Sequence, residues 1–227
     1  MFDGVVPPAS RSAVVYRADG AHWRPRFGRS VLCAGLKRTF DVIAAALVLL
    51  FLLPSCVAIA VSIALEGPGP ILFRQQRTGY RGRVFTIYKF RTMTMAGPDA
   101  SVSHATREDE RVTRIGRFLR ETSLDEIPQL LNVLRGEMAL VGPRPHAVEH
   151  DRHYAALLPR YDRRFAVRPG LTGLAQIQGL RGEVQDLRSM ARRIDADLLY
   201  ASHWSFMGDV AIMVRTLPLL IARVNAY

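Results

Sequence analysis

The sequence predicts an α+β protein attached to a membrane from one side, a monotopic arrangement. Three observations favour this class: a long uncharged stretch interrupted by a proline, two short strand-like segments after it, and several helical repeats of apolar residues with arginines on their other faces. We therefore expect a re-entrant N-terminal membrane helix hairpin, a small β-hairpin, and surface amphipathic helices packed on a compact domain.

The uncharged stretch, residues 42–65, contains 24 residues, and at about 1.5 Å per residue it is long enough to cross a bilayer. A straight transmembrane helix is therefore one interpretation. Pro54 lies near the middle of the stretch, where proline removes a backbone donor and bends a helix. Ser55, the next residue, could return its hydroxyl to a carbonyl oxygen freed at this bend.

Both flanks of the uncharged stretch are basic, which is typical of the cytoplasmic side of a membrane. A straight span would leave one basic flank outside, whereas a helix that enters, bends at Pro54 and returns keeps both at the anionic inner leaflet. We therefore favour a re-entrant helix over residues 35–66. The basic residues are Arg11, Arg17, Arg24, Arg26, Arg29, Lys37 and Arg38 before the stretch, and Arg74, Arg77, Arg81, Arg83 and Lys89 after it.

The remaining segments are assigned from turn residues and periodicity. Residues 1–34 are expected to form a flexible basic leader, and residues 67–227 the main domain. In that domain the sequence predicts a β-hairpin over 71–93 around "TGYRG", a mobile loop over 96–110, helices over 111–120, 124–134, 184–203 and 206–224, and irregular segments over 136–146 and 168–179.

Composition narrows the class of partner. The 49% of apolar residues supports a folded core, and the formal charge of +11 favours a polyanion, an anionic lipid surface or a phosphorylated substrate. Two cysteines, Cys33 and Cys56, give no disulfide framework and fit a reducing location. Charge alone does not choose among these partners.

An acidic pair, Asp125 and Glu126, stands at the start of an apolar helical pattern. Ser123 and Glu126 match a capping box, in which the two side chains satisfy orphan amides at a helix start. With Ser123 as cap, however, Pro128 would cost a helical bond, whereas with Asp125 as cap it falls in the tolerated first turn. Both a capping role and a chemical role for the pair remain open.

Cations surround this pair in the sequence, namely Arg111, Arg114, Arg117, Arg120, Arg135 and Arg144. A carboxylate beside guanidinium groups stays ionised at neutral pH. Mg²⁺ uses one or two carboxylates together with substrate phosphates, and arginines bind phosphate oxygens bidentately. The composition of the region therefore favours phosphoryl chemistry, without showing which acid does what.

Long motifs of the chain resemble the bacterial sugar transferases, monotopic phosphoglycosyl transferases that move a sugar 1-phosphate from a UDP-sugar to polyprenyl phosphate. The similarity runs from about Lys37 to Tyr227, and residues 180–212 look like the undecaprenyl-phosphate glucose phosphotransferases of exopolysaccharide synthesis. It rests on "KRTFDV" before the uncharged stretch, "YKFRTM" (88–93), "RETSLDEIPQLLNVLRGEMALVGPRP" (120–145) and "RPGLTGLAQIQG" (168–179).

This resemblance implies a role for each motif residue. Asp125 would attack the β-phosphate, giving a covalent phosphosugar-aspartyl enzyme and UMP, and Glu126 would bind Mg²⁺. Arg181 and Asp197 would line the nucleotide pocket, although each could equally form a structural ion pair. The residues expected to contact substrate or headgroup phosphate are Arg120, Arg144, Lys89, Arg91, Arg181 and Asp197.

The resemblance also implies the partners. These are a UDP-sugar, undecaprenyl phosphate, phospholipids of the bacterial inner membrane, downstream glycosyltransferases and, by family analogy, a second copy of the chain. The catalytic domain would lie on the cytoplasmic face. Glucose is the first choice of sugar, galactose the second, and an N-acetylhexosamine a further alternative. Nucleic acid is not expected, because no basic strand carries interleaved aromatics; a noncatalytic membrane scaffold is the remaining rival.

Overall fold

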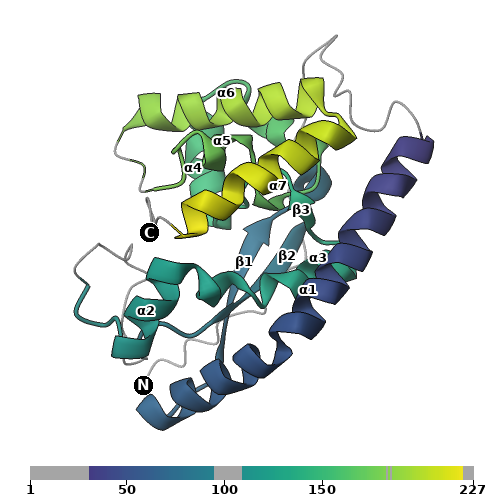
Figure 1. The fold of residues 1–227 in the computed structure, drawn as a ribbon. Helices are drawn as coiled ribbons and strands as arrows, with labels where there is room; N and C mark the ends of the chain where they lie inside the picture. Colours follow the sequence, from purple (N-terminus) through teal and green to yellow (C-terminus); the bar gives the residue numbers. More distant parts are fainter. Residues whose placement is uncertain (1–30, 95–108, 183, 185, 222–227) are drawn as a thin grey trace, which may run out of the picture.

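A long bent helix runs along one side of a body built from helices and two small sheets (Figure 1). The computed structural model describes residues 31–94, 109–182, 184 and 186–221. The predicted loop 96–110 and the leader 1–34 lie outside these residues, apart from 109–110 and 31–34. The mixed α+β class is confirmed.

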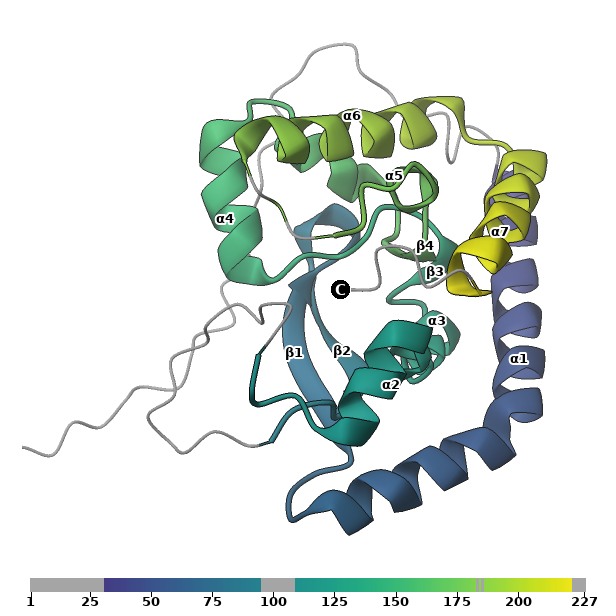
Figure 2. The same ribbon diagram turned by 60° about the vertical axis from the view of Figure 1, so that its left-hand side comes forward.

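The long helix, α1, spans Val31–Glu66 without a break and contains Pro54. Figure 2 shows it changing direction partway, so that one arm follows α7, β3 and α3 and the other passes beneath α2 and the β-hairpin. The expected bend is thus present, but the two arms do not fold back on each other as a hairpin. The helix also starts earlier than position 35. Further along α1, Ser62 donates its hydroxyl to the Ala58 carbonyl oxygen at 2.9 Å, whereas the contact proposed for Ser55 stays a prediction.

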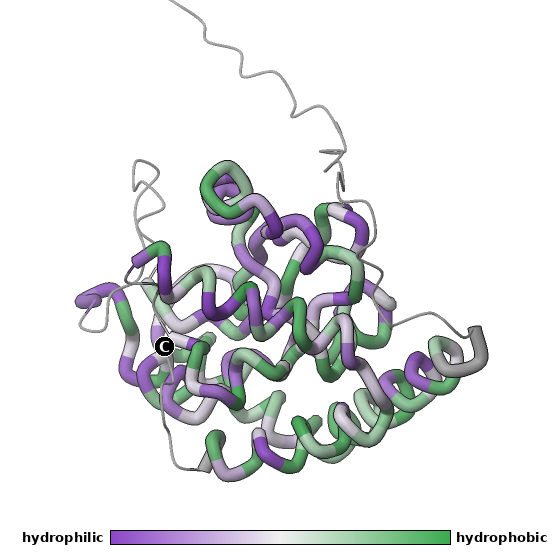
Figure 3. Tube along the Cα trace, turned by 90° about the horizontal axis from the view of Figure 1, so that it is seen from above, coloured by the Kyte–Doolittle hydropathy of each residue, from purple (hydrophilic) through white to green (hydrophobic). Residues whose placement is uncertain are grey.

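Much of α1 has no protein against it. Among the described residues, one helix is long and apolar enough to cross a membrane, and this is α1 over Ala34–Glu66. Phe51 and Leu65 are each 83% exposed, and the part of α1 that follows the grey N-terminal residues at the lower right of Figure 3 has mainly apolar colouring. Exposed apolar surface of this extent indicates contact with another apolar phase.

The predicted β-hairpin is confirmed. Strands β1, Leu72–Thr78, and β2, Val84–Phe90, pair antiparallel, with Leu72 opposite Phe90 and Thr78 opposite Val84. The connecting turn, Tyr80–Gly82, holds Arg81 in the left-handed region at φ +56°. Phe85 and Ile87 bury one face of β2, and Lys89, two residues beyond Ile87, leaves the strand on that same face.

A second sheet lies where the sequence predicted irregular structure. Strands β3, Ala139–Val141, and β4, Gly170–Thr172, pair in parallel. A Cβ on Gly170 would lie 2.0 Å from the Gly142 amide nitrogen, so the two backbones meet at glycines. Three-residue strands carry too little periodicity for detection, and the glycines that indicated loops are here required by this close approach.

The remaining helices surround these sheets (Figures 1 and 2). The helix predicted over 124–134 is divided, because Pro128 has no amide to continue the ladder. The helices predicted over 111–120 and 184–203 are present with shifted ends, and the one predicted over 206–224 is present from Phe206 to Ile221, while positions 222–224 lie outside the described residues. The elements are α2 (Arg114–Thr122), a 3₁₀ turn (Leu124–Glu126), α3 (Gln129–Arg135), α4 (Val148–Leu157), a 3₁₀ segment (Tyr161–Ala166), α5 (Leu174–Ile177), α6 (Leu187–His203) and α7 (Phe206–Ile221).

Candidate active site

The acidic pair occupies a tight turn between α2 and α3. Helix α2 ends at Ser123, which has a left-handed φ of +58°, and Leu124–Glu126 form the 3₁₀ turn directly after it. Such a conformation costs a residue other than glycine about 1–3 kcal/mol. Asp125 and Glu126 are each 7% exposed. Ser123 makes no side-chain cap on this turn, so the capping-box interpretation is wrong.

Three cations converge on Glu126. Lys89 Nζ, from β2, lies 2.9 Å from Oε1. Arg144, from the "PRP" motif, donates to both carboxylate oxygens, with its second contact at 3.2 Å from Oε2. The Arg181 guanidinium, from the loop after α5, lies 3.3 Å from Oε2. Segments far apart in the chain thus bring five predicted site residues together, the fifth being Asp125.

We call the group formed by Asp125, Glu126, Lys89, Arg144 and Arg181 the carboxylate cluster. Its two carboxylates differ in their surroundings. Burial favours the protonated form of Glu126, but the charges of Arg144, Lys89 and Arg181 outweigh it and hold the Glu126 pKa well below its usual range. Asp125 Oδ2 lies 3.5 Å from Lys89 Nζ. Burial raises the pKa of Asp125 above its ordinary value, opposed by Lys89 and assisted by the negative charge of Glu126. Asp125 is therefore the less stabilised and more basic carboxylate.

The other predicted site residues have different partners. The Arg120 Nε donates to the Thr92 hydroxyl at 3.0 Å. The guanidinium of Arg91 is buried and donates to three carbonyl oxygens at the C-terminal end of α1, so it holds the helix rather than facing Glu126. Asp197 accepts two hydrogen bonds from Arg164, at 2.9 and 3.2 Å. Of the two roles left open for Asp197, this contact is the structural ion pair.

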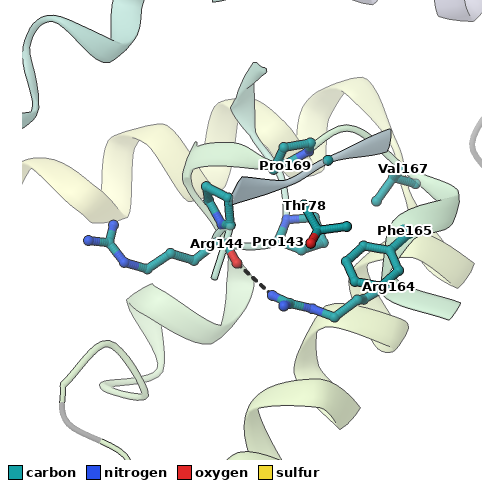
Figure 4. A pocket seen from close by; sticks show the side chains of 9 residues that line it. Thr78, Pro143, Arg144, Arg164, Phe165, Val167 and Pro169 are labelled. Atoms are coloured by element: carbon teal, nitrogen blue, oxygen red, sulfur yellow. Dashed lines mark hydrogen bonds between the residues drawn. The ribbon is translucent and has the colours of Figure 1, made fainter. Parts of the chain in front are cut away.

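Arg164 joins Asp197 to the carboxylate cluster. Its guanidinium donates to the Arg144 carbonyl oxygen at 2.6 Å, the contact drawn as a dashed line in Figure 4. Figure 4 also shows the Arg144 side chain directed away from the small pocket behind it, which Pro143, Phe165 and Val167 help to line. The pocket and the Arg144 guanidinium therefore lie on opposite sides of the Arg144 backbone, and Arg164 supports this backbone through its carbonyl oxygen.

The donor set limits what metal the cluster could hold. Among the described residues, no three His, Cys, Asp or Glu side chains gather as a metal site. Two adjacent carboxylates with three cations nearby suit Mg²⁺ bound jointly with phosphate oxygens, since this ion needs few protein ligands. Glu126 and Asp125 could supply those ligands once a phosphorylated substrate engages the cations.

The sequence analysis did not find the buried group that supports Arg144. Arg164 also contacts Asp151 and the Tyr161 hydroxyl, at 3.3 and 3.2 Å, and donates to His146 Nδ1 at 2.8 Å. These residues lie on separate segments without a common period. The position of His146, which is buried, directly after the "PRP" motif was the available signal.

The chain belongs to the bacterial sugar transferase family, which it matches over residues 32–223. It is 52% identical over 191 residues to a UDP-glucose:undecaprenyl-phosphate glucose-1-phosphate transferase of Caulobacter vibrioides, covering 84% of this chain and 72% of that protein. A protein of the same name from Escherichia coli is 47% identical over 80% of this chain, which spans 39% of that longer protein. An exopolysaccharide production protein of Rhizobium leguminosarum is 44% identical over 80% of this chain and 92% of its own length.

Proposed function

We propose that this protein transfers glucose 1-phosphate from UDP-glucose to undecaprenyl phosphate and releases UMP. The names of the Caulobacter and Escherichia relatives support the substrates. The observation that carries the chemistry is the unequal pairing of two adjacent buried carboxylates, Asp125 and Glu126, in a cluster of cations.

Asp125 acts as the nucleophile in this proposal. Its carboxylate oxygen bonds to the β-phosphorus of UDP-glucose while the bond from that phosphorus to the bridging oxygen breaks, and UMP leaves. An oxygen of undecaprenyl phosphate then bonds to the same phosphorus, and the Asp125 carboxylate leaves unchanged. The raised pKa of Asp125, caused first by burial, makes it the stronger base of the pair.

The cations hold phosphate in this proposal. Arg144 and Arg181 can move from Glu126 to the diphosphate, where planar guanidinium groups bind two oxygens at once. Bound Mg²⁺ would neutralise charge on the diphosphate. Glu126 is placed to ligate that ion, because departure of the arginines frees both of its oxygens.

Helix α1 attaches the enzyme to one leaflet of the inner membrane in this proposal, with the active site on the cytoplasmic face. From Pro54 to Glu66 the helix rises only about 18 Å, less than the ~30 Å hydrocarbon core. Basic residues precede and follow the apolar part. A helix bent at Pro54 can thus dip into the membrane and return, and downstream glycosyltransferases would extend the lipid-linked glucose there.

The test is an early-quench reaction of the purified full chain in lipid nanodiscs with radiolabelled UDP-glucose, UDP-galactose and UDP-N-acetylglucosamine. We expect Mg²⁺-dependent UMP release with UDP-glucose and a labelled adduct at Asp125 before acceptor is added. Faster turnover of UDP-galactose would replace glucose by the second sugar. Lipid product without any protein adduct would contradict the covalent route.

A further inference from the structure

Three of the groups of polar contacts that join α1 to the rest of the protein each end beside a segment that carries part of the carboxylate cluster. We call them the α7 clamp, centred on Lys37, the α3 clamp, made by Arg38, and the β2 clamp, made by Arg91. Lys37 and Arg38 belong to the "KRTFDV" motif, for which the transfer chemistry gives no role.

The α7 clamp is a buried charge cluster. Lys37 Nζ lies 3.0 Å from Asp41 Oδ1 and 2.8 Å from Asp209 Oδ2, and all three residues are at most 3% exposed. The indole nitrogen of Trp204 donates to Asp209 Oδ2 at 3.0 Å. A buried cation between two carboxylates fixes direction as well as distance, because each partner left unpaired would be costly. Helix α1 is therefore locked in register with α7.

This clamp continues to the segment of Arg144. The Tyr200 hydroxyl lies 2.9 Å from Asp209 Oδ1 and 2.9 Å from the Val141 carbonyl oxygen. Asp41 accepts a hydrogen bond from the Leu140 amide. Both Leu140 and Val141 belong to β3, which leads directly into the "GPRP" segment.

The α3 clamp leads to the acidic pair. Arg38 donates from Nη1 to the Val133 carbonyl oxygen at 2.6 Å and from Nη2 to the Leu134 carbonyl oxygen at 2.9 Å. These carbonyls are at the C-terminal end of α3, where a cation is favourable. Helix α3 starts three residues after Glu126, so this contact ties the turn that carries both carboxylates to α1.

The β2 clamp leads to Lys89. Arg91, two residues further along, donates to the carbonyl oxygens of Ile63, Gly67 and Pro68 at 2.8–3.0 Å. It thereby closes the C-terminal end of α1, on the far side of the bend from Lys37 and Arg38. The two arms of the helix are thus held independently.

We infer that the three clamps position the catalytic carboxylate relative to the membrane, and that they serve the lipid-dependent half of the reaction. The inference rests on the proposed function. UDP-glucose arrives from solution and needs only the carboxylate cluster. The phosphate of undecaprenyl phosphate is held at the bilayer surface. Its oxygen therefore reaches the phosphorus on Asp125 only if α1 holds Asp125 at the matching depth relative to that surface. A misplacement of about 1 Å can slow a reaction about a hundredfold. Lys37 and Asp209 are accordingly positioning residues.

The experiment separates the two half-reactions of the full chain in nanodiscs. Asp209→Asn keeps the size of the side chain and the Lys37–Asp41 pair, and Lys37→Met is the stronger variant. We expect both to release the first equivalent of UMP from UDP-glucose within about twofold of wild type, whereas transfer from the adduct to undecaprenyl phosphate falls at least about tenfold. Thr216→Val is the matched control: it removes the 2.7 Å hydrogen bond from α7 to Thr172 without touching α1, and should change neither step.

Each result decides something. An equal loss in both half-reactions, or no loss of lipid transfer in folded Asp209→Asn, overturns the inference and leaves the proposed function standing. Wild-type protein that forms no adduct removes the proposed function and the inference with it. If Lys37→Met proves too unstable to purify, Asp209→Glu takes its place. Because it keeps the negative charge that Asp209→Asn removes, it should show more lipid transfer than Asp209→Asn.

Discussion

Asp209 and Asp125 are both buried beside a lysine, but they are paired to different degrees. Asp209 lies 2.8 Å from Lys37 and accepts hydrogen bonds from Tyr200 and Trp204. Asp125 lies 3.5 Å from Lys89, which is closer to Glu126 at 2.9 Å. A carboxylate with both oxygens engaged at short distances holds structure, whereas one left weakly engaged remains available to react. The comparison therefore separates a structural charge cluster from a chemical one.

The strongest way to break this comparison is Asp125→Asn. An amide cannot form the acyl phosphate, so UMP release from UDP-glucose should fall at least about a thousandfold, or about 4 kcal/mol of barrier. Quenched-flow measurement of UMP checks this. The control is Asp195→Asn, in an exposed pair with Arg160, which should leave the rate unchanged. Persistence of more than a few per cent of wild-type release would remove Asp125 from the chemistry.

Lys37→Met tests the structural side of the comparison. It leaves Asp41 and Asp209 buried without their cation, a loss of about 3–5 kcal/mol in the free energy of unfolding. For a chain of this size the apparent Tm should fall by roughly 6–20 °C. Thermal unfolding in one detergent measures it. Arg160→Met, which breaks an exposed pair, is the reference and should cost less than about 1 kcal/mol; equal shifts would show that the Lys37 cluster is not structural.

Arg144→Lys sharpens the chemical side. A lysine keeps the charge but loses contact with both oxygens of Glu126, or of a diphosphate. We expect kcat/KM for UDP-glucose to fall about thirtyfold to a hundredfold, equivalent to about 2–3 kcal/mol, with the fold intact. Steady-state UMP assays together with thermal unfolding distinguish the two. A wild-type value of kcat/KM would contradict the bidentate role.

The smallest effect concerns the pH dependence of stability. Burial, aided by the charge of Arg164, lowers the pKa of His146 well below its ordinary value. The unfolded chain takes up this proton near pH 6.5 and the folded chain does not, so stability falls below that pH by up to about 1.4 kcal/mol per pH unit. His146→Gln should flatten this part of the profile between pH 7 and 5. Parallel profiles of apparent Tm for the two proteins would refute it.

The sequence was most informative where one segment holds the whole signal. The bend in α1 follows from Pro54, and the β-hairpin from a turn between two strand patterns; both need only neighbouring residues. The division of the predicted 124–134 helix was also available in principle from Pro128. By contrast, the β3 and β4 pair depends on two glycines 28 positions apart in the numbering, and no local pattern shows that they meet.

The residues of the candidate site also differ in how far the sequence predicted their positions. The motifs indicated Lys89, Arg144 and Arg181 as well as the acidic pair, and these lie together. Arg91 came from the same "KFR" motif as Lys89 yet faces the end of α1, because β2 ends at Phe90 and the alternation that would place positions 89 and 91 on one face of a strand no longer applies. A motif identifies which residues matter without showing whether each binds substrate or holds another element.

The backbones of β3 and β4 lie so close together where the two strands pair that even the methyl group of an alanine would not fit at their glycines. A methyl group on Gly142 would meet the Arg168 carbonyl oxygen at 2.3 Å, and one on Gly173 would meet the Gly142 carbonyl oxygen at 2.2 Å. Any attempt to broaden the range of sugar nucleotides should therefore leave Gly142 and Gly173 unchanged and vary the loop around Arg181, because an alanine at either glycine would shift the backbone that carries Arg144.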